Sequence, residues 1–108
     1  MLIRQGDVLL QPVPISLVPT GRSVPRHDGR LVLATGELSG HAHVVRDEHA
    51  ELVTREGARE LFLLVHGAPT TLTHEEHSAL TVPPGAYRVV RQREYVPVPE
   101  QDERYAYD

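Results

Sequence analysis

The segment that decides the fold is Glu60-Leu-Phe-Leu-Leu-Val-His66, Gly67-Ala-Pro69, Thr70-Thr-Leu-Thr-His74. Residues 61–65 are apolar at both odd and even positions, which is typical of a strand covered on both faces. Gly67-Ala-Pro69 is a turn signal, and 70–74 follows it as a second strand candidate. A strand, a short turn and another strand predict antiparallel β-structure in this part of the chain.

Short strand candidates recur on both sides of this segment, and glycine or proline marks nearly every junction between them. The candidates are 2–10 with a turn or bulge at Gly6-Asp7, Arg30–Thr35, His41–Arg46, Glu51–Arg55, Glu60–His66, Thr70–His74, Ala79–Val82 and Tyr87–Val96. One helical alternative, 47–62, is disfavoured by Gly57 and by the β-branched pair Val53-Thr54. We therefore predict a small single-domain, all-β barrel or sandwich of about seven to nine strands.

We expect the β domain to span residues 1–99. Residues 11–30 are rich in proline, which donates no ladder hydrogen bond, so this stretch is expected to form an edge segment or a loop. Residues 100–108 carry four acids against Arg104, and we expect a flexible acidic tail. Without signal-peptide features or an apolar run near the ~20 residues of a membrane span, the sequence predicts a cytoplasmic protein with no membrane segment.

Composition narrows the classes of function. The chain of 108 residues has no cysteine, which excludes disulfides and thiolate metal sites, and its net charge of −4 argues against nucleic-acid binding. Lysine and asparagine are both absent, and arginine takes the place of lysine throughout. This bias favours a GC-rich bacterial or phage genome. No nucleophile elbow, phosphate-binding loop or dinucleotide glycine pattern is present, so no organic cofactor is predicted and enzymatic activity stays open.

Four of the seven histidines form two tight groups. His41 and His43 are two residues apart in a strand candidate, so their imidazoles share a face. His74 and His77 are three apart, so both rings converge if they lie in a turn, whereas only one reaches the site if they lie in a strand. Imidazole suits Zn, Fe, Mn and Ni, and we predict a metal site formed by these four residues.

Two glutamates are candidate ligands or general bases beside that metal, namely Glu75 and Glu48. Two other interpretations of the histidine groups stay open: polar recognition without a metal, and surface turns without a functional role. The remaining histidines, His27, His49 and His66, are weaker candidates. On the last strand candidate, Arg91 and Arg93 share a face and predict either an anion site or, as we favour, an edge paired with acids such as Glu94 and Asp7.

The segment Gly36-Glu-Leu-Ser-Gly-His41-Ala-His43, followed by Glu48, resembles the first motif of the cupin superfamily, and Leu80-Thr-Val-Pro83-Pro-Gly85 resembles the second. The likeness covers residues 36–90 and implies a β-barrel in which His41, His43, Glu48 and a later histidine hold a metal. Arg88 stands where the later histidine is expected, so His74 or His77 would have to supply that ligand. The whole chain also resembles small bacterial and phage-type proteins with Gly-His-x-His and His-Glu-Glu-His patterns.

Two functions follow from these patterns. The first is a metal-binding small β-barrel protein that acts on or senses a small molecule through its histidines. The second is a non-enzymatic adaptor or structural module that docks on a protein partner through its proline-rich segment and the tail tyrosines Tyr105 and Tyr107. A homodimer paired through exposed edge strands is the default assembly for either function.

Overall fold

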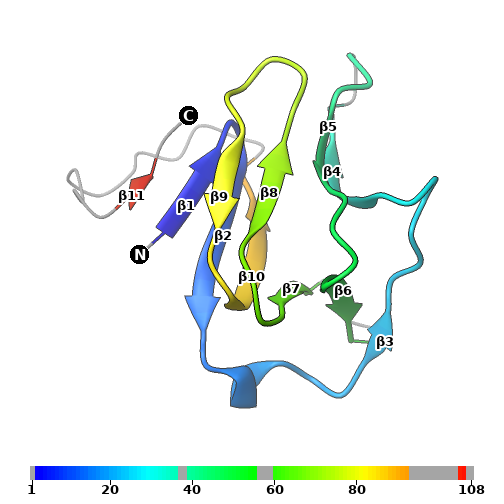
Figure 1. The fold of residues 1–108 in the computed structure, drawn as a ribbon, viewed down its shortest axis with the longest axis vertical. Coiled ribbons are helices and arrows are strands. Elements are labelled where there is room, and N and C mark those ends of the chain that lie inside the picture. Colours follow the sequence, from blue (N-terminus) through cyan, green and yellow to red (C-terminus); the bar gives the residue numbers. More distant parts are fainter. Residues whose placement is uncertain (1, 37–38, 56–59, 93–104, 107–108) are drawn as a thin grey trace.

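The computed structural model describes residues 2–36, 39–55, 60–92 and 105–106, and Figure 1 shows their arrangement. The first elements are β1 (Leu2–Gln5), β2 (Val8–Val13), the 3₁₀ turn η1 (Ile15–Leu17) and β3 (Arg22–Ser23). The strands that follow are β4 (Leu31–Thr35), β5 (Ala42–Val45), β6 (Ala50–Thr54), β7 (Leu61–Val65), β8 (Thr70–Thr73), β9 (Leu80–Val82), β10 (Gly85–Arg91) and β11 (Tyr105–Ala106). The predicted all-β class is confirmed.

The strands form two sheets that pack as a sandwich, and in the described residues they do not close into a barrel. One sheet has seven strands in the order β11-β1-β2-β10-β7-β6-β3, and the other has four in the order β4-β5-β8-β9. Neighbours pair antiparallel, except β1 and β11, which run parallel. The strands exceed the expected seven to nine because residues 2–13 fold as a hairpin and because β3 and β11 are two-residue strands.

One hydrophobic core fills the space between the sheets. Buried side chains from the seven-stranded sheet, such as Leu10, Leu52 and Leu63, meet Val45 and Leu72 of the four-stranded sheet. Each is fully or almost fully buried, which removes apolar area from water at about 25 cal/mol per Å². This core fixes how the two sheets face each other, and therefore which loops meet at their edges.

β7 lies between β10 and β6, as its apolar residues on both parities predicted. Leu63 and Val65 point into the main core, whereas Leu64 belongs to a smaller cluster that Val18 partly covers. Val18 comes from the proline-rich stretch 11–30, which contributes the end of β2, η1 and the edge strand β3. This stretch therefore covers part of the outer face of the larger sheet.

The observed strands from β4 to β9 lie within one residue of the expected bounds at each end. The Gly6-Asp7 turn is confirmed as the connection between β1 and β2. Several expected features lie outside the described residues: Gly57, the end of the last strand candidate with Arg93 and Glu94, and the tail apart from 105–106. Among the described residues, no helix could cross a lipid bilayer.

Candidate functional site

The four predicted histidines come together at one end of the two inner strands of the four-stranded sheet, β5 and β8. His41 and His43 lie at the start of β5, and His74 and His77 lie in the bend between β8 and β9. The ring of His74 is central: its centroid is 5.7 Å from that of His41, 4.4 Å from His43 and 4.6 Å from His77. The histidine cluster, meaning these four residues, thus forms because β5 and β8 are hydrogen-bonded neighbours and because 74–77 is a turn.

His43 is the buried member of the histidine cluster, with 3 % of its surface exposed. Its Nδ1 lies 2.8 Å from Oε1 of Gln5, and its Nε2 lies 3.1 Å from Oδ1 of Asp7. Burial lowers the pKa of His43 below its ordinary value of 6.5, and the neighbouring His74 adds to this effect, while Asp7 acts in the opposite direction. The neutral imidazole is therefore favoured at this position.

Gln5 fixes which nitrogen of His43 carries the proton. The Nε2 group of Gln5 donates to the carbonyl oxygens of Leu72 at 3.0 Å and Ser78 at 2.9 Å. Because carbonyls only accept, the amide orientation of Gln5 is set, and its Oε1 must accept from His43. The neutral ring of His43 is therefore protonated at Nδ1 and has a lone pair at Nε2.

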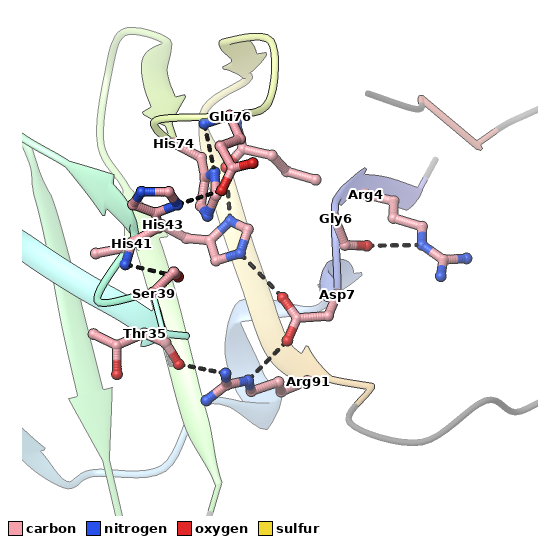
Figure 2. A network of polar contacts seen from close by, with 12 residues as sticks. Arg4, Gly6, Asp7, Thr35, Ser39, His41, His43, His74, Glu76 and Arg91 are labelled. Carbon is pink, nitrogen blue, oxygen red and sulfur yellow. Dashed lines mark hydrogen bonds and ion pairs between the residues drawn. The ribbon is translucent and has the colours of Figure 1, made fainter. Parts of the chain in front are cut away.

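Asp7 connects the histidine cluster to the larger sheet, as Figure 2 shows. Its Oδ1 faces His43, and its Oδ2 accepts from Nε of Arg91 at 2.9 Å. Burial alone would raise the pKa of Asp7, but the neighbouring Arg91 and His43 outweigh this effect and hold that pKa below its ordinary value of 3.8. Arg91 also donates to the carbonyl of Thr35. The predicted pairing of Arg91 with Asp7 is confirmed, but the predicted strand edge is wrong, because β10 lies between β2 and β7.

His77 reaches this group because residue 6 is glycine. A Cβ on Gly6 would lie 2.6 Å from Nε2 of His77, closer than real contacts allow. Gly6 also has a φ of +57°, in the left-handed region that glycine adopts without strain. The turn between β1 and β2 therefore brings its backbone, with Asp7, directly against His77.

His41 and His74 are held by the loop that follows β8. Nδ1 of His74 accepts a hydrogen bond from the backbone N–H of Glu76 at 3.0 Å, so a neutral His74 carries its proton on Nε2. Nδ1 of His41 is buried and lies 2.5 Å from Oε1 of Glu76, close enough for an ion pair but not aligned as a hydrogen bond. A proton on this nitrogen avoids a lone-pair clash with the carboxylate, which leaves Nε2 of His41 as its acceptor.

The two candidate glutamates lie in different places. Glu75 is next to the histidine cluster, where its Oε1 accepts from the backbone N–H of Ala42 at 2.9 Å; this hydrogen bond lowers its pKa. Glu48 is exposed in the turn after β5, at the other end of that strand from His41. Arg88 pairs with Glu60 at 3.1 Å and lies over the ring of Phe62. The structure therefore does not bring Glu48 and Arg88 together with His41 and His43.

As the side chains stand, no group of three or more histidine, aspartate and glutamate residues in the described part of the chain is arranged to hold a metal ion. The rings contact one another without surrounding a common point. The remaining histidines lie elsewhere. Nε2 of His49 contacts the carbonyl of Pro69, and Nε2 of His66 lies 3.7 Å from Oε2 of Glu51. The backbone of His27 pairs with that of Arg30.

Comparison with known protein families identifies one match. A family model described as a domain of unknown function, DUF8820, matches residues 4–92. The chain belongs to this family. No curated protein and no solved structure matches it. The DUF8820 range includes the whole histidine cluster together with Gln5, Asp7 and Arg91, and it ends before the acidic tail.

Sequence reasoning treated Gly6-Asp7 as a turn and Asp7 as an acid that pairs with arginine, but it did not connect Asp7 with the histidines, and it gave Gln5 no role. One signal for Gln5 was available. It is two residues from Ile3 on a strand, so both side chains point to the core, and a polar residue at a core position requires a buried partner. No such signal existed for Asp7, because its contact with His43 depends on how the two sheets are placed.

Proposed function

We propose that this DUF8820 chain binds a divalent transition metal at the histidine cluster and uses it to act on or sense a small molecule. The observation that carries the proposal is the contact between Nε2 of His43 and the carboxylate of Asp7. With Nδ1 protonated, the lone pair of Nε2 faces an anionic oxygen at 3.1 Å. Two acceptors at that distance repel each other unless His43 takes up a second proton or a metal cation lies between Nε2 and Oδ1.

The second contact of His43 supports a metal as that cation. Metal-binding histidines almost always donate their other ring N–H to an oxygen acceptor, which orients the ring and raises its basicity. Gln5 has this role for His43, and Glu76 is placed to have it for His41. Both rings of the Gly-His-x-His segment thus present Nε2 as the available donor atom.

The proposed ligands are His41, His43, His77 and Asp7. His74 acts first as a hydrogen-bond donor, because its Nδ1 already accepts from Glu76 and its Nε2 then bears a proton. It becomes a ligand only if that hydrogen bond breaks. Since the donor atoms do not surround one point, we expect the side chains to rotate when the metal binds. An imidazole and carboxylate set suits Zn, Fe, Mn or Ni, and the bound metal would supply Lewis acidity.

The test is metal content by elemental analysis of untagged protein after reconstitution with each of these four metals. We expect near-stoichiometric binding that is lost when His41 and His43 are both replaced by alanine. Because His43 is buried, Asp7→Asn provides a milder variant of nearly unchanged shape, and we expect it to weaken metal affinity about 10–100-fold.

His66→Ala is the matched control, since His66 is exposed and lies outside the histidine cluster. It should leave the metal content unchanged. Stoichiometric binding that survives the double substitution, or that Asp7→Asn does not weaken, would contradict the proposal, as would absence of binding for all four metals. Circular dichroism of each variant separates loss of metal from loss of fold.

A second candidate function is a non-enzymatic docking module, and one observation favours it. Ile15 and Leu17 of η1 are 66 % and 57 % exposed, which places two large apolar side chains in solvent on the proline-rich stretch. If they dock on a second copy of the chain, the protein is a dimer in solution. Replacing both by serine should then give a monomer by light scattering, and an unchanged assembly state would exclude this form of the hypothesis.

A further inference from the structure

A cavity of about 240 Å³ lies on the outer face of the four-stranded sheet and shares His74 with the histidine cluster. Its floor is Ala42 and Val44 of β5, which are 7 % and 3 % exposed. The other lining residues are polar or charged: Arg30, Arg46, Thr73, His74 and Glu75. A small apolar floor with a few convergent polar groups is typical of a small-molecule site.

The cavity has a cationic end and a histidine end. Ala42 and Val44 of β5 and Arg46, which directly follows it, are spaced two residues apart and line the same side of the chain over about 13 Å. Glu75, bonded to the backbone of Ala42, marks one end together with His74. Arg46 marks the other end, where Arg30 is near because its neighbour Leu31 pairs with Val45.

Both arginines are available to a ligand. Among the described residues, neither Arg30 nor Arg46 has a carboxylate within ion-pair distance, unlike Arg88 and Arg91. Nη1 of Arg46 donates to the hydroxyl of Thr73 at 3.0 Å, which holds its guanidinium at the cavity wall. Nε of Arg30 is 3.3 Å from the carbonyl of His27, which leaves its terminal nitrogens as donors.

The backbone that bears these two arginines is fixed by a third. Arg26 donates to the carbonyls of Gly29 and Arg46 at 3.1 and 3.3 Å, and to those of Asp47 and Ala50 at 2.7 Å each. These bonds tie the turn before Arg30 to the segment after β5. The two walls of the cationic end are therefore held at a set separation before any ligand binds.

We infer that this cavity binds a small organic monocarboxylate, with its carboxylate at Arg30 and Arg46 and its apolar body over Val44 and Ala42 toward His74. Two guanidinium groups against the Glu75 carboxylate leave one net positive charge, which one carboxylate neutralises and a phosphate dianion does not. Arginine also matches the planar carboxylate with paired hydrogen bonds. The role of this ligand as substrate rests on the proposed function, whereas its binding needs no metal.

The test is NMR titration of metal-free protein with butyrate, followed through the amide signals of Ala42, Val44 and Thr73. Butyramide, which has the same shape without the charge, and inorganic phosphate are the comparison probes. We expect saturable shifts with butyrate, weaker binding of phosphate and none of butyramide. Arg30→Gln and Arg46→Gln should each weaken butyrate binding about ten-fold, whereas Arg22→Gln, an exposed arginine on β3, should not change it.

Absence of saturable shifts with butyrate, equal binding of butyramide, tighter binding of phosphate, or butyrate affinity unchanged in both arginine variants would each overturn the inference. The spectra themselves report whether every variant is folded. The variant with alanine at His41 and His43 distinguishes the two proposals, because it should lose the metal but retain butyrate. If wild-type protein binds butyrate and no metal, the monocarboxylate site stands and the metal proposal fails.

Discussion

Gln5 has no charge and belongs to no motif, yet its side-chain amide makes three contacts that position His43. Two of them reach the carbonyls of Leu72 and Ser78, and the third reaches Nδ1 of His43. Its side chain is completely buried, so water cannot replace any of these partners. A single neutral residue therefore sets both the proton position and the orientation of the buried imidazole of His43.

We predict that Gln5→Leu lowers the free energy of unfolding by about 2–3 kcal/mol, because it leaves buried polar groups without partners at about 1–3 kcal/mol each. Chemical denaturation measures this change. Metal affinity should fall as well, since the ring of His43 loses its orienting acceptor. A variant as stable as the wild type would show that water or another group satisfies His43.

Gly6 gives a second prediction at this scale, with Gly29 as its matched control. Both have positive φ, +57° and +74°, so alanine strains the backbone at either position by about 1–2 kcal/mol. A Cβ at Gly29 meets nothing within 4 Å, whereas one at Gly6 collides with His77. Gly6→Ala should therefore destabilise the protein more than Gly29→Ala and should also weaken metal binding. Equal losses in unfolding free energy and unchanged metal affinity would mean that His77 moves aside freely.

At the scale of elements, the strands were predictable because each carries its own signal. Alternation, β-branched residues and glycine or proline at the junctions define β4 to β9 locally, without knowledge of partners. The order of strands in the sheets has no such local signal, since β10 pairs with β2 and β7, which are distant from it in the sequence. For the same reason, the sequence left open whether the turn 74–77 brings both of its histidines to His41 and His43. It gave no indication of the contact between Asp7 and His43.

Arg26 links two such elements and gives a prediction of its own. Its four bonds to carbonyls hold the turn before β4 against the segment after β5. We expect Arg26→Gln to lower the unfolding free energy by about 1–2 kcal/mol, since a shorter amide cannot reach all four acceptors. Thermal denaturation measures this change. Arg22→Gln, at an exposed position of β3, is the control and should have little effect in that measurement. If the two variants melt alike, the four bonds contribute nothing measurable.

For the whole molecule, the stability of the sandwich depends on pH, and His43 and Asp7, whose pKa values are lowered in the fold, contribute to this dependence. An unfolded chain protonates His43 near its ordinary pKa of 6.5, whereas the folded metal-free protein does so only at lower pH. The unfolded state therefore binds more protons in this window, and stability falls as pH falls below 6.5. Asp7 adds a second loss below 3.8, where the unfolded chain gains a proton before the folded one.

We predict that the denaturation midpoint of metal-free protein decreases between pH 7.5 and pH 5.5, and that His43→Gln makes this decrease smaller. The relevant quantity is the dependence on pH, because the substitution also alters stability at every pH. A wild-type midpoint that is constant over this interval would show that the folded and unfolded chains titrate alike. A variant with the same dependence would assign the effect to other histidines.

The position of the histidine cluster has a consequence for how the protein opens. Its histidines lie on or next to β5 and β8 of one sheet, whereas Gln5, Asp7 and Arg91 lie on or next to β1 and β10 of the other. The polar network therefore joins the two sheets of the sandwich. Gln5 also donates to the carbonyls of Leu72 and Ser78, so neither the hairpin of β1 and β2 nor the turn after β8 can open alone without breaking hydrogen bonds between them. The two segments should thus form a single cooperative unit, with amide hydrogens that exchange at a common rate, and a ligand held there would slow the exchange of both together.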